Sequence, residues 1–118
     1  MIIGDFNNGT NLADAPGNAF VHSDLFDALP AHGFQDGWRG IHGNAQDHSF
    51  EAWYGWRRLD HIFHSEHVKV LDADYQREVG DLLLTKNPAQ PQRKAISDHA
   101  ALVAEVELRT PTGRPKGR

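Results

Sequence analysis

A regular alternation of apolar and polar residues begins at Ala100 and ends at Leu108. Every even position in this stretch is apolar, and Glu105 and Glu107 stand between them. Successive side chains of a strand point to opposite faces, so a period of two predicts a β-strand with the even-numbered side chains from Leu102 to Leu108 in a core. The apolar face of such a strand needs another layer of structure to cover it.

Further apolar runs predict more strands, separated by loops rich in Gly, Pro, Asn and Asp. These runs cover residues 1–4, 50–54, 58–64, 68–75 and, less regularly, 82–85. Gly55 favours a hairpin between the second and third runs. In the third run, one face is predicted to carry Leu59, His61 and Phe63, and the other Arg58, Asp60, Ile62 and His64.

One segment has the pattern of a helix. Ser23 is suited to the N-cap position, because its hydroxyl can accept a hydrogen bond from a free backbone N–H of the first turn. Leu25, Phe26 and Leu29 follow as an apolar stripe. Gly33 is expected to end the segment, since glycine readily takes the left-handed conformation found after helices.

Together these elements predict the α/β (α+β) class, with one mixed, mostly antiparallel β-sheet and a covering helix. Residues 1–108 are expected to form one domain, which fits a chain of 118 residues. Residues 40–46 are expected to be a loop. Residues 109–118 are rich in Pro, Gly and basic side chains and are predicted to be a disordered basic tail.

Charge and composition narrow the classes of partner. Four of the 12 basic residues lie in the last ten positions, so the rest of the chain carries 8 basic and 16 acidic residues. Such an acidic body is poorly suited to non-specific nucleic-acid binding, which needs Lys or Arg at phosphates. No apolar run approaches the roughly 18 residues of a membrane span. The chain has no Cys and shows no secretory signal, so the cytoplasm is the default expectation.

Three short motifs place acidic residues beside the strand-like runs. They are Gly4-Asp5-Phe6-Asn7, Arg58-Leu59-Asp60-His61-Ile62-Phe63 and Ser97-Asp98-His99. They supply carboxylates, a carboxamide and an imidazole, which is a set suited to holding a divalent cation and cleaving a phosphate ester.

Each motif also has a purely structural interpretation. Asp5 and Asn7 are common in turns at strand ends. Asp60 interrupts an apolar strand, where a carboxylate needs a partner, and a salt bridge to Arg57 or Arg58 would provide one. Ser97-Asp98-His99 can also be an Asp-His pair that fastens a loop. Arg57 and Arg58 themselves are expected to be surface or structural pairs rather than phosphate clamps.

In this order and spacing, the three motifs resemble the C-terminal half of the endonuclease/exonuclease/phosphatase superfamily. Its members include deoxyribonuclease-I-like nucleases, abasic-site endonucleases, sphingomyelinases and inositol-phosphate phosphatases. The resemblance runs from Ile2 to about Leu108 and implies half of a four-layer deoxyribonuclease-I-like sandwich. Family members are about twice as long as this chain, and their N-terminal half holds a metal-binding Glu and a mid-chain catalytic His. The resemblance therefore also implies a truncated domain, with weak or no activity alone.

The resemblance implies a metal-dependent phosphoester hydrolase, such as a nuclease or phosphodiesterase, that uses Mg²⁺ or Mn²⁺. By the same resemblance, Asp5, Asn7, Asp60 and His99 would be catalytic, and Asp98, Asp5 and Asn7 would hold the metal. His99 would act as general base or stabilise the pentacovalent phosphate, and Asn7 would contact the scissile phosphate. A histidine suits this role because its ordinary pKa lies near neutrality. The substrate stays open between nucleic acid and a small phosphoester.

Two other functions stay open. The first is a non-catalytic remnant or interaction module whose exposed sheet face pairs with another chain, in a homodimer or with a separate N-terminal half. The second is a small nucleic-acid-binding protein that uses its tryptophans and basic tail, which the acidic body disfavours.

Overall fold

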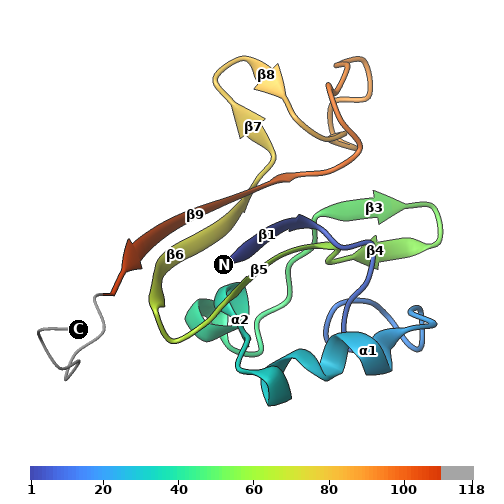
Figure 1. Ribbon diagram of the computed structural model, residues 1–118. Coiled ribbons are helices and arrows are strands. Elements are labelled where there is room, and N and C mark those ends of the chain that lie inside the picture. Colours follow the sequence, from blue (N-terminus) through green and yellow to red (C-terminus); the bar gives the residue numbers. More distant parts are fainter. Residues whose placement is uncertain (110–118) are drawn as a thin grey trace, which may run out of the picture.

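The structure is a computed structural model that describes residues 1–109 (Figure 1). Its helices are α1 (Ser23–Asp27), the 3₁₀ helix η1 (Leu29–His32) and α2 (Gly37–His42). Its strands are β1 (Ile2–Asp5), β2 (Gln35–Asp36), β3 (Phe50–Ala52), β4 (Gly55–Arg57), β5 (Asp60–His64), β6 (Val68–Gln76), β7 (Glu78–Val79), β8 (Leu82–Leu83) and β9 (Ala101–Leu108). Short helices beside antiparallel strands place the chain in the α+β class. Of the predicted tail, all but Arg109 falls outside the described residues.

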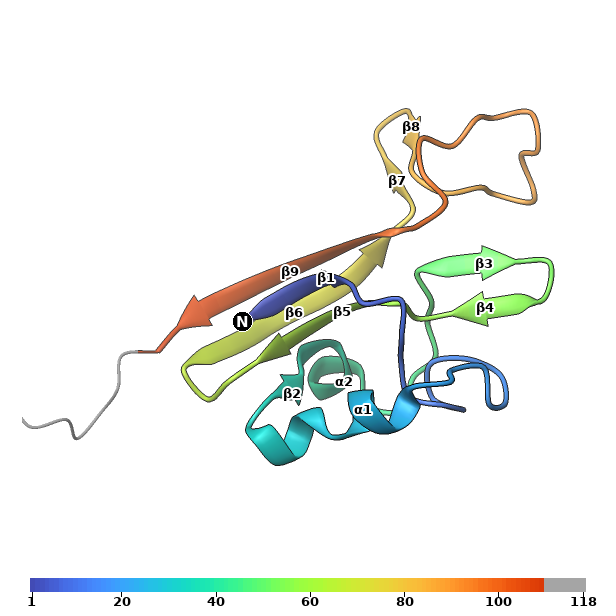
Figure 2. The same cartoon turned by 45° about the vertical axis from the view of Figure 1, so that its right-hand side comes forward.

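The strands do not form the single mixed sheet that the sequence predicts. Within residues 1–109 they pair in four separate sheets, β1-β5-β2, β3-β4, β6-β9 and β7-β8, and every pair is antiparallel. Figure 2 shows the long β6-β9 ribbon running from the end of β5 to the β7-β8 hairpin. Strands β5 and β6 are not joined by backbone hydrogen bonds. They are connected by packed side chains and by α2, so the predicted single sheet is divided.

The predicted hairpin exists, but with a different second strand. Phe50 pairs with Arg57 across the β3-β4 ladder, and the turn between them ends at Gly55. The ladder stops at Arg58, whose N–H donates to the carbonyl of Asp14 at 2.7 Å. Ser49 Oγ then accepts the next two backbone N–H groups, at 3.0 and 3.1 Å. These bonds redirect the chain into β5, which pairs with β1 and β2 instead.

Helix α1 begins at the expected place but is capped differently. Ser23 is its first residue rather than its N-cap, and His22 holds the cap position without a side-chain hydrogen bond. The Ser23 hydroxyl instead accepts the N–H of Asn11 at 3.1 Å, which ties the helix to the preceding loop. Gly33 ends the helical segment with φ 84°, as predicted.

Helix α2 extends into residues 40–46, which the sequence predicts to be a loop, so that prediction is wrong for residues 40–42. Asp36 caps it by accepting the N–H of Arg39 at 3.1 Å. A Cβ on Gly37 would come within 2.8 Å of Val70, so only glycine lets the helix lie this close to β6. The helix is therefore fixed by a tertiary contact and by its cap rather than by an apolar period.

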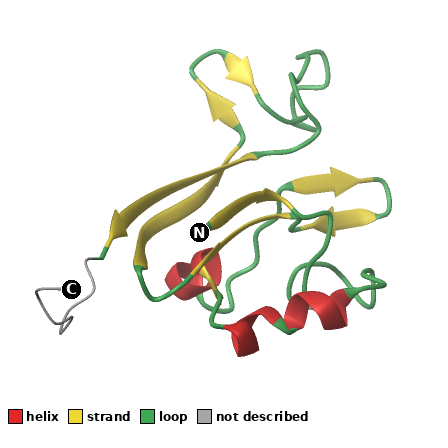
Figure 3. Cartoon of the chain, in the orientation of Figure 1, coloured by secondary structure: helices red, strands yellow, loops and turns green. Residues whose placement is uncertain are grey.

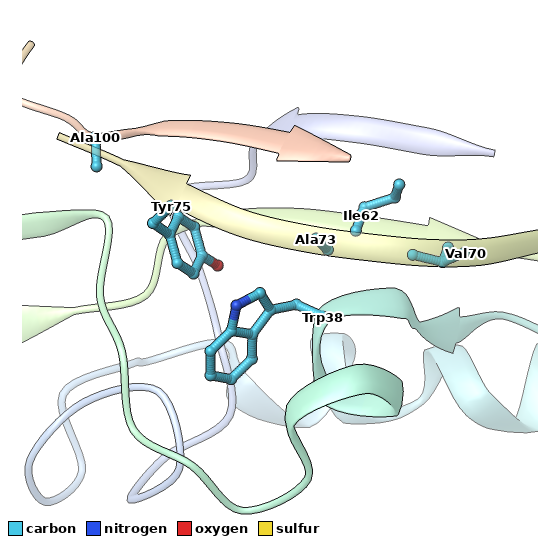
Figure 4. Packing of buried hydrophobic residues seen from close by; sticks show 6 residues of the cluster. All are labelled: Trp38, Ile62, Val70, Ala73, Tyr75 and Ala100. Atoms are coloured by element: carbon cyan, nitrogen blue, oxygen red, sulfur yellow. The ribbon is translucent and has the colours of Figure 1, made fainter. Parts of the chain in front are cut away.

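Trp38 carries α2 into the main core (Figure 4). Its indole lies beneath β6, beside Tyr75 and Ala73, and Ile62 of β5 joins the same cluster. Leu102, Ala104 and Val106 of β9 pack against this cluster, which confirms their inward direction. Leu108 is 78% exposed, so the prediction for the end of that strand is wrong. It lies past the end of the core that would have covered it.

The opposite face of β5 packs on α1. His61 and Phe63 lie with Phe6 and Phe26 in an aromatic cluster whose ring centroids are 4.6–6.1 Å apart. The predicted faces of β5 are therefore correct, with Ile62 directed toward α2. Figure 3 shows the helices gathered on one side of the strands. No helix within residues 1–109 is both long enough and apolar enough to cross a membrane.

Candidate functional site

Backbone pairing brings the three motifs to one place. Asp5, the last residue of β1, stands directly opposite Asp60, the first residue of β5. His99 precedes β9 and forms an isolated bridge with Phe50 of β3. Like charges directly opposite each other on neighbouring strands are destabilising, so this pair of carboxylates needs a positive group between them.

The imidazole of His99 lies against these carboxylates. His99 Nδ1 is 2.7 Å from Asp60 Oδ2, and because a carboxylate can only accept, Nδ1 carries the hydrogen. His99 Nε2 is 3.9 Å from Asp5 Oδ2 and 3.9 Å from Asp98 Oδ1. Asp60 therefore sets the tautomer of the ring and turns Nε2 toward the two other carboxylates.

The surroundings of His99 favour its charged form. Partial burial lowers the pKa of His99, but the hydrogen bond and charge of Asp60, with smaller contributions from Asp5 and Asp98, outweigh it. The net effect is a pKa above the ordinary value of 6.5. The neutral ring is thus a stronger base than an ordinary histidine.

Asn7 reaches the same site through a strained backbone. Its φ is 51°, in the left-handed region that few residues other than glycine adopt. Its N–H donates to Asp5 Oδ1 at 2.8 Å, which closes a tight turn at the end of β1. The turn that the structural interpretation predicts is therefore present, and it also places the carboxamide of Asn7 on the cleft beside His99.

A cleft of about 400 Å³ opens at this point. Polar groups and an apolar wall share its lining, which consists of Asn7, Ala19, Phe20, Phe50, Tyr54, Arg57, Leu59, Asp98 and His99. Phe50 lies 5.2 Å from the imidazole of His99, measured between ring centroids. The cleft therefore exposes a polar corner to solvent and backs it with aromatic side chains.

Three groups could share one metal ion. One ligand atom each from Asp5, Asp60 and His99 lies within 4.8 Å of the others. Asp98, predicted as a metal ligand, is outside this group, and its side chain is 81% exposed. Its carboxylate nevertheless faces the same His99 nitrogen as that of Asp5. The oxygen donors of the site match the preference of Mg²⁺ and Mn²⁺ for hard ligands.

All five predicted residues thus reach one rim of the molecule. Asp60 does not form the predicted salt bridge with Arg57 or Arg58, because its partner is His99. His99 in turn pairs with Asp60 rather than mainly with its neighbour Asp98, so the motif does more than close its own loop. Nothing in the local sequence connects Asp60 with His99, since the two are 39 positions apart.

A second charged cluster lies beside the first and is buried. Arg58, 1% exposed, donates from Nε to Asp14 Oδ1 at 2.7 Å and pairs through its terminal nitrogens with Asp36. Its guanidinium also lies 4.9 Å from the centroid of the Trp38 ring. Burial by itself would lower the pKa of Arg58, but the two carboxylates raise it by a larger amount. The net shift is upward, so the guanidinium stays charged.

The sequence pointed to Arg58 as a structural residue but missed its partners. Asp14 lies in a loop of turn formers and Asp36 before an unpredicted helix, so neither attracts notice in the sequence. Arg39 also reaches Asp14, at 2.9 Å. A signal was available: an arginine at the start of an apolar core strand is buried with that strand and then requires acidic partners.

Comparison of the chain with protein-family models, with curated proteins and with solved structures finds no match. The function of the site therefore has to be argued from its own chemistry.

Proposed function

We propose that the cleft at His99 is the site of a metal-dependent phosphoester hydrolase. The observation that carries this proposal is the Asp60-His99 hydrogen bond of 2.7 Å, which leaves Nε2 facing Asp5 and Asp98 across the cleft. A carboxylate, an oriented imidazole and further carboxylates at one rim match the needs of phosphate ester hydrolysis. The order of the three motifs, and their resemblance to the endonuclease/exonuclease/phosphatase superfamily, support the same class.

The residues of the chain divide the work by position. Asp60 holds Nδ1–H of His99, so that Nε2 can take a proton from an attacking water. Asn7 presents its amide to a non-bridging phosphate oxygen. Asp5, Asp98 and the amide oxygen of Asn7 are the donors we assign to Mg²⁺ or Mn²⁺. The bound ion would offset the charge that develops on the phosphate.

The finer description of the fold belongs to the same proposal. We take the described residues as one half of a deoxyribonuclease-I-like sandwich, with a second layer contributed by another segment or chain. In support, the apolar residues Met1, Ile2 and Ile3 at β1 are about half exposed, as is Val103 of β9. Without that layer, we expect turnover to be weak.

Hydrolysis of bis(p-nitrophenyl) phosphate tests the proposal. We expect the wild-type chain to cleave it only with Mg²⁺ or Mn²⁺, and His99→Ala to lower the rate by roughly 10²- to 10⁴-fold. His67→Ala is the matched control, because this histidine is exposed and pairs only with Glu66 at 3.9 Å. Cleavage that persists in EDTA, or that is equal in both variants and wild type, would refute the assignment.

Metal binding can be measured even if hydrolysis is too slow to detect. Mn²⁺ is paramagnetic and broadens the NMR signals of nearby nuclei, so it should broaden the imidazole signals of His99 before those of His67. Asp5→Asn should weaken this effect, since it removes a carboxylate from the site. If His99 and His67 broaden equally, the chain has no metal site at the cleft.

The second candidate function is an interaction module without catalysis. The half-exposed apolar side chains of β1 and β9 favour it, since such groups are usually covered by a partner. Light scattering during size-exclusion chromatography tests it. A stable dimer that shows neither hydrolysis nor Mn²⁺ binding would favour the module, whereas a monomer that hydrolyses the ester would exclude it.

A further inference from the structure

One arginine faces the cleft without an acidic partner. Arg57 lines it beside His99 and Asp98. No carboxylate of residues 1–109 lies within 4.0 Å of its guanidinium, whereas each of the four other arginines before residue 100 has a carboxylate within 3.2 Å. Its neighbour Arg58 is the clearest contrast, because it is buried and fully paired. Arg57 is thus a cation left available for an anion.

The guanidinium of Arg57 is held over a tyrosine. Its central carbon lies 4.3 Å from the centroid of the Tyr54 ring. A cation stacked on an exposed ring gains only about 0.5–1 kcal/mol, but the contact keeps the guanidinium beside the ring without neutralising its charge. The planar fork of a guanidinium is suited to two parallel hydrogen bonds to a phosphate. The contact therefore leaves Arg57 charged and able to bind an anion.

Aromatic rings extend from this arginine along the hairpin turn. Trp53 is 96% exposed and lies edge-on to Tyr54, with ring centroids 5.5 Å apart. On the inner side, Phe50 and Phe20 line the cleft near His99. An exposed tryptophan of this kind contributes nothing to the core. Flat side chains beside a phosphate-binding cation are the arrangement on which nucleic-acid bases stack.

We propose that Arg57 and Tyr54 form the substrate-binding part of the cleft and select phosphodiesters of nucleosides. Arg57 binds non-bridging phosphate oxygens, and the ring of Tyr54, which lines the same cleft, stacks on the base. The proposal rests on the proposed hydrolase function, which it narrows to nucleotide-containing esters. It also explains how a site with several carboxylates can bind an anion. The carboxylates of Asp5 and Asp98 repel a phosphate, and the positive charge of Arg57 at the same opening attracts it.

Binding without catalysis is the first test. Thymidine 3′,5′-bisphosphate is titrated into the chain in EDTA, with tryptophan fluorescence as the readout. We expect Arg57→Ala to weaken binding by at least about tenfold and Arg57→Lys by less, since lysine keeps the charge but loses the fork. Tyr54→Ala should also weaken binding, whereas Tyr54→Phe should retain it. Arg109→Ala is the matched control, because that exposed arginine lies at the far end of β9.

Two esters with the same leaving group provide the second test. Thymidine 5′-(p-nitrophenyl phosphate) and methyl p-nitrophenyl phosphate differ only in the group that the ring of Tyr54 would contact. In the presence of Mg²⁺ we expect kcat/KM to favour the thymidine ester by about tenfold or more, and Tyr54→Ala to remove this preference.

The outcomes separate the two proposals. If both esters resist cleavage but Arg57→Ala still abolishes bisphosphate binding, the hydrolase assignment fails and the nucleotide site stands. If both esters are cleaved equally and Arg57→Ala and Tyr54→Ala behave as wild type, the hydrolase stands and the inference is overturned. Binding of Trp53 to phosphatidylcholine vesicles, without bisphosphate binding, would also overturn it.

Discussion

Arg58 and Asp60 stand on either side of Leu59 in the sequence, and each is the centre of a cluster of charged side chains. The two clusters differ in burial and in how their charges are paired. Around Arg58, every charged group has a partner of opposite sign, and Arg58 and Asp14 are almost completely buried. Around Asp60, three carboxylates face one imidazole in an open cleft. The two clusters share the side chain of Tyr75, whose hydroxyl donates to the Asp60 carbonyl at 2.6 Å and lies 3.5 Å from the Arg58 guanidinium.

The difference teaches how a small chain separates stability from chemistry. A carboxylate paired with a guanidinium has no charge left for a ligand, so Asp14 and Asp36 can only stabilise the fold. Because Arg58 is fully occupied by those two, Asp60 is left to a titratable partner. Three carboxylates are then left around His99, where a cation can bind them. Each prediction below tests this division.

The largest effect is expected from breaking the buried cluster. Arg58→Met should lower the free energy of unfolding by about 3–5 kcal/mol, since it removes the arginine that Asp14 and Asp36 share and leaves Asp14 with the partly exposed Arg39. Urea denaturation measures this change. Arg57→Met is the matched control and should cost less than about 0.5 kcal/mol. Equal losses for both arginines would mean that the buried cluster does not stabilise the fold.

The second-largest effect is expected at low pH, where protonation of Asp14 should lower the free energy of unfolding. Burial raises the pKa of Asp14, but the charge of Arg58 and hydrogen bonds to the carboxylate outweigh it, so its pKa lies below 3.8 in the folded state. A depressed pKa contributes stability that is fully present above the unfolded value and is lost as pH falls through the folded value. The unfolding free energy should therefore decline below about pH 4.

Asp14→Asn supplies the comparison for the acid experiment. The variant should be less stable than wild type at neutral pH and should show a flatter decline in acid, because its amide does not titrate. Unfolding in urea at a series of pH values gives both quantities. A variant whose stability falls as steeply as that of wild type would show that other carboxylates cause the acid loss.

A substitution in the cluster around Asp60 should lower the unfolding free energy less than a substitution in the buried cluster around Arg58. Asp60→Asn should cost only about 1 kcal/mol of unfolding free energy, which is the typical value of one hydrogen bond. The same variant should lose most hydrolysis, because a neutral amide does not stabilise the charged ring and can turn its NH₂ group toward Nδ1, which favours the other tautomer of His99. Urea denaturation and ester cleavage measure the two effects separately. A large stability loss at Asp60 would contradict the division between the clusters.

The smallest expected effect is a difference between the pKa values of two histidines, His61 and His99. His61 is buried among phenylalanines, and desolvation lowers its pKa, whereas the pKa of His99 is raised. In metal-free protein, His61 should therefore titrate below pH 6.5 and His99 above it. The stability linked to His61 is fully present above pH 6.5 and is lost as pH falls through its lower folded pKa, whereas that linked to His99 is lost as pH rises through its folded pKa.

NMR titration of the imidazole signals checks these directions. Adding Mg²⁺ should lower the pKa of His99, because a nearby cation disfavours the imidazolium, and should leave that of His61 unchanged. His67 is the exposed reference. The comparison fails if His61 and His99 titrate together, or if Mg²⁺ moves neither.

Much of the fold could be predicted where a local period carries the information. The alternation in β9 places Leu102, Ala104 and Val106 correctly, and the two faces of β5 are also correct. The errors occur where a contact between distant segments decides the local conformation. The β3-β4 hairpin ends early because Ser49 and Asp14 capture the next backbone N–H groups.

The candidate site was predicted in its members but not in its pairing. All five motif residues lie at one rim, but the only partner that the sequence suggested for Asp60 was Arg57 or Arg58, in the structural interpretation, and Asp60 binds His99 instead. Arg57 was expected to be structural, and only its position on the cleft shows it to be without an acidic partner among the described residues. An arginine's partner cannot be read from its neighbours in the chain.

By itself, the sequence determined which chemical groups were present and which strand faces were apolar, because these depend on residue type and on a period of two. Only the tertiary structure decided which charge met which. The bond from Arg58 to Asp14 spans 44 positions, and that from His99 to Asp60 spans 39. Ion pairs of this kind form where strand register and burial bring side chains together, and their energy depends on distance in space rather than along the chain.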